Sequence, residues 1–131
     1  MFKKYNFIHT DSYYQTNKIN DCIIDPYKTR AWFKKGQLHR EDGPAIIYIN
    51  GDTEWWRDGK LHREDGPAIE SKNSVKMWLK NGQFHREGGP AIEYVNGDKH
   101  WYKNGKHHRE DGPAIEYING AKHWVFEDMY Y

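Results

Sequence analysis

Short apolar and aromatic stretches alternate with turn-forming residues along most of this chain. Each stretch is only a few residues long, which is too short for a typical helix. Pairs such as Asp58-Gly59, Asn81-Gly82 and Asn104-Gly105 separate several of them. Asn-Gly and Asp-Gly favour type I′ hairpins because both central residues must adopt positive φ. The pattern therefore predicts an all-β fold, an antiparallel meander of short strands joined as β-hairpins.

The pattern repeats every 23 residues, which makes this a tandem-repeat protein. The string His-Arg-Glu-Asp-Gly-Pro-Ala-Ile begins at His39, His62 and His108, and a near copy at His85 has Gly88 in place of Asp. One tryptophan keeps the same register throughout, as Trp32, Trp55, Trp78, Trp101 and Trp124. We divide the array into four units, 32–54, 55–77, 78–100 and 101–123.

The two ends differ from the array. Residues 1–31 are interpreted as an N-terminal cap, in which 22–31 form a degenerate strand pair because Cys22-Ile23-Ile24 lies one period before Ala45-Ile46-Ile47. A cap is expected because an open sheet exposes unpaired edge groups. Residues 124–131 begin a fifth unit and are rich in aromatic side chains. They are either a C-terminal capping strand or a contact with a partner or a second copy of the chain.

Turn length predicts which residues face one another across each hairpin. A two-residue turn at Asn50-Gly51 predicts that Ile46 faces Trp55, and the following turn predicts that Trp55 faces His62. This row of Ile, Trp and His, repeated in each unit, is the predicted buried face.

The opposite face varies between units, and a repeat array can carry its specificity on such a face. Tryptophan and tyrosine are also enriched among the residues that dominate interface energetics. The candidate partner-binding residues on this face are Trp56, Leu79, Phe84, His100, Tyr102, His107 and His123.

Composition indicates a folded domain with little net charge. Only 37% of the residues are hydrophobic, but 16% are aromatic, whereas disordered chains are poor in aromatics. A net charge of +1 argues against a nucleic-acid partner bound by bulk electrostatics. The single cysteine, Cys22, fits a reducing compartment, and neither a signal peptide nor an apolar run of membrane-spanning length is present. We therefore expect a cytoplasmic protein.

The candidate chemistry is sparse, so we expect neither an enzyme nor a bound metal or cofactor. The Arg-Glu-Asp groups recur from unit to unit, whereas an active site needs its carboxylates once, in unequal environments. Cys22 lies in an apolar stretch typical of inert packing, and each glycine is attributed to a turn. Histidines one unit apart are separated by roughly 10–14 Å, too far to share a zinc ion. His100, His107 and His123 instead suggest a pH-sensitive or partner-contacting patch.

The units resemble a variant form of the MORN repeat, with the pattern Trp-x-x-x-Gly-x-x-His-Arg-Glu-Asp-Gly-Pro-Ala and an Asn-Gly-Asp turn such as Asn96-Gly97-Asp98. The resemblance covers 32–124 and extends to arrays in proteins of bacteriophages and giant viruses. It implies an elongated, twisted single sheet that contacts proteins and, in some members, phospholipids. His-Arg-Glu-Asp-Gly-Pro stands where His-Gly-x-Gly is usual, which leaves two or three strands per unit.

Two functions are expected from these observations. The first is a non-enzymatic module that binds a protein, such as a viral accessory protein that binds and inhibits a host defence protein. The second is a membrane-surface module, for which the recurring Lys34, Arg57, Lys80 and Lys103 would supply the basic face. Oligomerisation through the aromatic C-terminal segment remains open.

Overall fold

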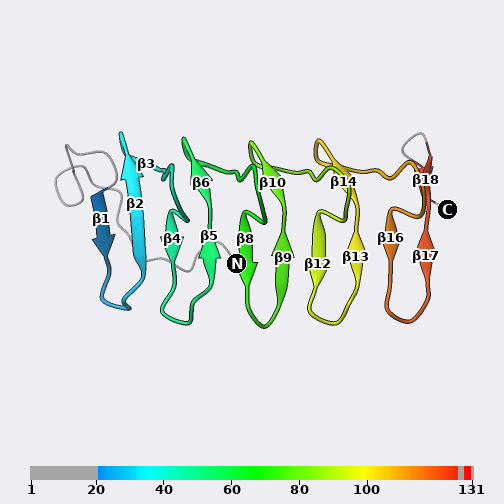
Figure 1. Cartoon of the computed structure of the whole chain (residues 1–131), viewed down its shortest axis with the longest axis horizontal. Coiled ribbons are helices and arrows are strands. Elements are labelled where there is room, and N and C mark those ends of the chain that lie inside the picture. The colour runs from blue at the N-terminus through cyan, green and yellow to red at the C-terminus, as the bar shows by residue number, and fades with distance from the viewer. Residues whose placement is uncertain (1–20, 127–128, 131) are drawn as a thin grey trace.

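The computed structural model describes residues 21–126 and 129–130, and every regular element in this part of the chain is a β-strand. Residues 1–20 of the predicted N-terminal cap therefore lie outside the described residues, whereas its predicted strand pair at 22–31 lies within them. Neighbouring strands pair antiparallel, so the all-β hairpin meander predicted from the sequence is confirmed. The strands follow one another along the long axis of the molecule (Figure 1).

A large open sheet contains eleven strands. Its strands are β1 (Asp21–Ile24), β2 (Arg30–Lys34), β3 (Gln37–Leu38), β4 (Ile46–Ile47), β5 (Thr53–Glu54), β8 (Ile69–Ser71), β9 (Val75–Met77), β12 (Ile92–Tyr94), β13 (Lys99–His100), β16 (Ile115–Glu116) and β17 (Lys122–His123). All but β3 follow one another in sequence order across the sheet, and β3 pairs with β2 alone.

Four separate hairpins accompany the large sheet. They are β6 (Trp56–Arg57) with β7 (Lys60–Leu61), β10 (Leu79–Lys80) with β11 (Gln83–Phe84), β14 (Tyr102–Lys103) with β15 (Lys106–His107), and β18 (Val125–Phe126) with β19 (Met129–Tyr130). Unit 55–77 thus contributes four short strands, β6 to β9, rather than the two or three expected. The hairpins lie in a row beside the sheet, so the units do not form one single sheet (Figure 1).

The turns at the tips of the first three of these hairpins have the predicted type I′ geometry. Asp58 and Gly59 have φ of 49° and 77°, and Asn81 and Gly82 have φ of 52° and 79°. Trp56 consequently pairs with Leu61, as the two-residue turn predicts.

The turns within the large sheet differ from the prediction. Ile46 pairs with Glu54, so the prediction that Ile46 faces Trp55 is wrong. The loop has three residues, closed by a 2.9 Å hydrogen bond from Gly51 N–H to Tyr48 O, and only Gly51 adopts positive φ, 93°. This is the geometry of a type I turn followed by a G1 bulge. A shift of one residue moves a whole strand to the other face of a sheet, so Glu54 and its equivalents join the row of isoleucines.

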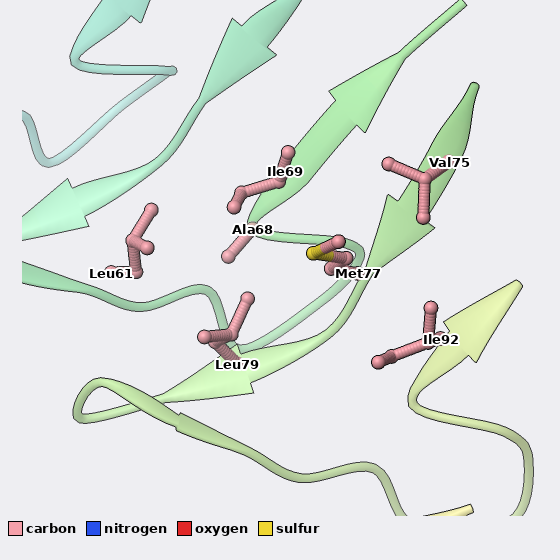
Figure 2. Packing of buried hydrophobic residues seen from close by; sticks show 7 residues of the cluster. All are labelled: Leu61, Ala68, Ile69, Val75, Met77, Leu79 and Ile92. Atoms are coloured by element: carbon pink, nitrogen blue, oxygen red, sulfur yellow. The ribbon is translucent and has the colours of Figure 1, made fainter. Parts of the chain in front are cut away.

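The hydrophobic core forms where the large sheet meets the row of hairpins (Figure 2). Sheet residues such as Ile69 and Met77 pack with hairpin residues such as Leu61 and Leu79, and all four are at most 8% exposed. Burial of each such side chain stabilises the fold by about 1.5–3 kcal/mol. The full cluster is Leu61, Ala68, Ile69, Val75, Met77, Leu79 and Ile92. A second cluster contains Ala31, Phe33, Leu38 and Ile46.

From β8 to β17, the other face of the large sheet carries charges of alternating sign. Glu93 pairs across the strands with Lys76 on one side and with Lys99 on the other, and Glu116 lies between Lys99 and Lys122. These positions alternate along each strand with the buried isoleucines, so they point away from the core. We call this surface the charge ladder. Positive and negative side chains alternate on this surface and compensate one another. The side chains that differ most in chemical type between units therefore lie on the opposite face, toward the core.

Candidate functional site

An arginine stacked on a tryptophan organises each unit. The guanidinium carbon of Arg63 lies 3.9 Å from the ring centroid of Trp55, and the other units have the same contact at 3.8–3.9 Å. A Cβ added to Gly66 would lie 2.8 Å from that carbon. The attribution of these glycines to turns is therefore wrong: Gly43, Gly66, Gly89 and Gly112 lack positive φ and instead leave room for the arginine.

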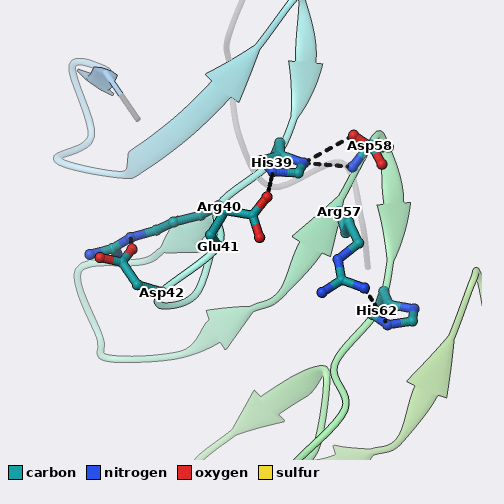
Figure 3. A network of polar contacts seen from close by, with 7 residues as sticks. All are labelled: His39, Arg40, Glu41, Asp42, Arg57, Asp58 and His62. Carbon is teal, nitrogen blue, oxygen red and sulfur yellow. Dashed lines mark hydrogen bonds and ion pairs between the residues drawn. The ribbon is translucent and has the colours of Figure 1, made fainter. Parts of the chain in front are cut away.

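Hydrogen bonds fix the arginine within its loop. Nη1 of Arg40 donates to the carbonyl oxygen of Pro44 at 3.1 Å, and Nε donates to Oδ1 of Asp42 at 3.2 Å, as Figure 3 shows for the acidic partner. The first contact recurs in all four units, and the second recurs at Arg63 and Arg109. The repeated Arg, Asp and Pro of the sequence string are thus structural residues.

A histidine links each of the first three units to the next. Nδ1 of His62 accepts a hydrogen bond from the backbone N–H of Asn81 at 2.9 Å, and Nε2 lies 2.9 Å from Oε1 of Glu64. Since Nδ1 is the acceptor, Nε2 carries the hydrogen and donates to Glu64. That hydrogen bond, received by the carboxylate, lowers the pKa of Glu64. His39 bonds Asp58 in the same way, as Figure 3 shows.

The predicted partner-binding residues do not lie opposite the core. Leu79 belongs to the core cluster, and Trp56, Phe84 and Tyr102 pack against it. His100 and His107 are half-buried, and His123 is exposed. His100 and His123 were misplaced because the three-residue turns shift the register of the large sheet. The other five were misplaced because they lie on hairpins that are separate from that sheet. The partner-binding role of these residues stays a prediction.

Aromatic side chains from the last two units and from the C-terminal segment gather on the core side of the molecule. The ring centroids of Tyr102 and His107 are 4.1 Å apart, those of Phe84 and Tyr102 are 5.0 Å apart, and those of His107 and Tyr130 are 5.3 Å apart. We call the set the C-terminal aromatic cluster. It consists of Phe84, Tyr94, His100, Tyr102, His107, Tyr117, His123 and Tyr130.

A hydrogen-bonded chain runs through this cluster. Nδ1 of His100 lies 3.2 Å from Nε2 of His107, whose own Nδ1 lies 2.6 Å from the hydroxyl of Tyr130. Burial lowers the pKa of both histidines, and for His107 the proximity of His100 lowers it further. Both rings are therefore neutral at neutral pH, with polar nitrogens at the edge of an aromatic surface. The sequence pattern indicated His100 and His107 as candidate site residues, but it did not predict the contact with Tyr130.

The first unit has a buried carboxyl group at the position that His100 occupies in the third. Glu54 is 4% exposed, and its oxygens accept hydrogen bonds from the hydroxyl of Tyr48 at 3.0 Å and from Nε1 of Trp56 at 2.9 Å. Burial raises the pKa of Glu54, and these hydrogen bonds partly oppose that rise. Glu54 also lines an open cavity of about 660 Å³ with Ile69 and Val75. Sequence reasoning missed it because it belongs to no recurring motif.

The described residues offer little reactive chemistry. Between residues 21 and 126 and at 129–130, no three His, Cys, Asp or Glu side chains come together as a metal site. Cys22 is exposed, contrary to the expectation of inert packing, and desolvation raises the pKa of its thiol, the opposite of an activated nucleophile. The same part of the chain contains no apolar helix of membrane-spanning length.

Comparisons with known proteins do not assign the chain to a family. No protein-family model, curated protein or solved structure matches it significantly. The geometry of the chain's own residues therefore has to support any function.

Proposed function

We propose that this protein is a non-enzymatic, MORN-like repeat module that binds a partner protein through the C-terminal aromatic cluster. The main support for the proposal is that equivalent positions in successive units carry different kinds of side chain. Met77 and Leu79 are buried in the core, whereas His100 and Tyr102, one unit later, are half-exposed rings in contact with each other. The same scaffold thus presents aliphatic core in one unit and amphipathic rings in the next.

Such a surface is well suited to an interface with another protein. Tyrosine and histidine present an apolar ring together with a polar tip, and residues of this kind are favoured where a surface is desolvated on binding. The rings are already held by contacts with one another and with the core, so little rotamer freedom is lost on association.

Our proposal for the kind of partner is based on the resemblance of the units to repeat arrays in phage and giant-virus proteins. On that basis we propose a host protein, in particular a defence protein that the module inhibits, and a cytoplasmic setting.

The repeats supply substitutions that test the proposed surface without introducing foreign residues. His100→Met with Tyr102→Leu copies Met77 and Leu79 from the preceding unit, so the fold should persist. Lys99→Thr copies Thr53 on the charge ladder and serves as the control. Partners captured by the tagged protein from the lysate of its host and identified by mass spectrometry should be lost with the double variant and retained with the control. Equal capture by both variants contradicts the proposed surface.

A second candidate function, binding to a membrane surface, is favoured by one observation. The turns at one edge of the large sheet end in exposed apolar side chains, with Ile49, Val95 and Ile118 at 70–76% exposure. Insertion of such tips into a lipid interface would bury apolar area, although the net charge of +1 gives little attraction to anionic lipid. Flotation with vesicles of phosphatidylcholine and phosphatidylserine tests it, with Ile118→Lys, which copies Lys72, as the variant that should abolish binding.

A further inference from the structure

One arginine of the array lacks an acidic partner that the other three possess. In three units the Nε of the arginine donates to an aspartate Oδ1 at 3.0–3.2 Å. In the third unit Gly88 replaces that aspartate, and Nε of Arg86 makes no hydrogen bond to any residue that the structure describes. The side chain of Arg86 is also more open, at 30% exposure against 21–22% for the other three arginines.

The position left by the missing aspartate opens into a cavity. This cavity has a volume of about 460 Å³ and lies between the loop 86–90 of the third unit and residues 101–111 of the fourth. Gly88 and Arg86 line it from one side, and Tyr102 and Lys103 line it from the other. A Cβ added at Gly88 would meet no atom within 4 Å, so nothing in the described structure fills this position.

The charges around the cavity leave two cationic donors available. Two of its three acidic groups have hydrogen-bond partners, since Glu87 lies 3.2 Å from His85 and Asp111 lies 3.1 Å from Arg109, and the third, Glu110, is 83% exposed to solvent. Lys103 forms no ion pair with any described residue, and Arg86 uses only Nη1, toward Pro90 and toward Glu93 at 3.1 Å. The Nε of Arg86 and the ammonium of Lys103 therefore remain for an external anion.

We propose that the cavity beside Arg86 binds the carboxylate of a ligand, in the place that the side chains of Asp42, Asp65 and Asp111 occupy in the other units. Those units show that a carboxylate oxygen fits 3.0–3.2 Å from the arginine Nε while the guanidinium stays stacked on its tryptophan. The stacking holds the donor in place before the ligand arrives, which lowers the entropic cost of binding. Charge-assisted hydrogen bonds from arginine to carboxylate are among the stronger ones in proteins.

The four equivalent arginines allow a direct test by NMR. Acetate is titrated into the protein at constant ionic strength, and the ¹H–¹⁵N signals of the arginine Nε groups are followed. The Arg86 signal should shift and saturate, while those of Arg40, Arg63 and Arg109 stay in place. No shift at Arg86, or equal shifts at all four arginines, overturns the proposal. A capped aspartyl peptide that binds at least ten-fold more tightly than acetate identifies a protein side chain as the natural ligand, and equal affinities identify a free organic acid.

Two substitutions sharpen the test. Gly88→Asp restores the repeat's own carboxylate and should abolish the acetate shift at Arg86. Asp65→Gly should create an acetate-induced shift at Arg63. Unchanged NMR signals elsewhere in this variant would show that a Gly-Gly loop is compatible with the fold. Gly88 has a φ of 79°, so Gly88→Asp requires the loop to adopt the backbone of the other three units. An acetate shift that persists in a folded Gly88→Asp variant, or the absence of a response at Arg63 in Asp65→Gly, contradicts the proposal.

Discussion

The backbone N–H of Asn81 donates a hydrogen bond to Nδ1 of His62 in the preceding unit, at 2.9 Å. The donor lies in a type I′ turn and the acceptor in the His-Arg-Glu string, so the two recurring motifs of the sequence meet across the boundary between units. A backbone bond from Gly82 N–H to Leu61 O, at 2.8 Å, lies beside it. Histidine in this array therefore couples one repeat to the next.

Replacement of this histidine should destabilise the protein. His62→Ala leaves the N–H of Asn81 and the carboxylate of Glu64 without their partner in a site where the ring is 6% exposed. We expect a loss of about 2 kcal/mol in the free energy of unfolding, measured with urea. His108→Ala is the matched control, because that ring is 48% exposed and should cost little. Equal losses in the two variants would show that the inter-unit contact contributes nothing.

The arginine and the glycine of each unit should be energetically coupled. Gly66→Ala forces the guanidinium of Arg63 away from Trp55, and Arg63→Ala removes the same contact, so each should cost about 1–2 kcal/mol. Because both changes lose one interaction, the double variant should cost about as much as either single change. Additive losses in a double-mutant cycle would contradict this explanation of the glycine.

Glu54 should make stability depend on pH in the acid range. Burial raises its pKa above the ordinary value of 4.5, so between the unfolded and folded pKa values the folded state binds more protons. The contribution of this group to stability is therefore present below the unfolded pKa and is lost as pH rises through the folded pKa. Glu54→Gln keeps acceptor and donor groups for Trp56 and Tyr48 and should remove that dependence. Parallel stability profiles of the two proteins from pH 3 to pH 8 would contradict the assignment.

The histidine pair predicts the opposite trend near neutrality. Burial lowers the pKa of His107 below 6.5, so the folded state binds fewer protons than the unfolded state. The associated stability is present above the unfolded pKa and is lost as pH falls through the folded pKa. His107→Phe, which copies Phe84, should flatten the decrease in unfolding free energy between pH 7 and pH 5. An unchanged slope would show that His107 does not titrate in this range.

The sequence was sufficient for the repeat, the all-β class and the type I′ hairpins, because Asp-Gly and Asn-Gly occur at the tips of alternating stretches. It was insufficient for the sheet register. Asn50-Gly51 is compatible both with a two-residue turn and with a three-residue loop in which only Gly51 has positive φ, 93°. Which of the two turns forms depends on strand pairing along the whole sheet and not on the Asn-Gly dipeptide alone.

The misplacement of His100 and His123 follows from that one-residue shift, and that of the other candidate residues follows from their position on separate hairpins beside the sheet. With Ile46 opposite Glu54 and not Trp55, residues such as His100 and Met77 fall beside the isoleucines. The role of Gly43 and its equivalents was equally hidden, because it depends on where a side chain three residues earlier folds back. Local propensity identifies turns, but contacts of this kind appear only once the units are stacked.

Hydrogen exchange of the protein alone and in complex with its captured partner tests the central claim most directly. We expect the partner to slow exchange in residues 99–107 and 117–123, which carry most of the C-terminal aromatic cluster. The turn tips at 49–51 and 95–97 should be unaffected. Protection confined to those tips or to the first two units, with none at 99–107, would contradict the claim that the aromatic cluster is the binding surface.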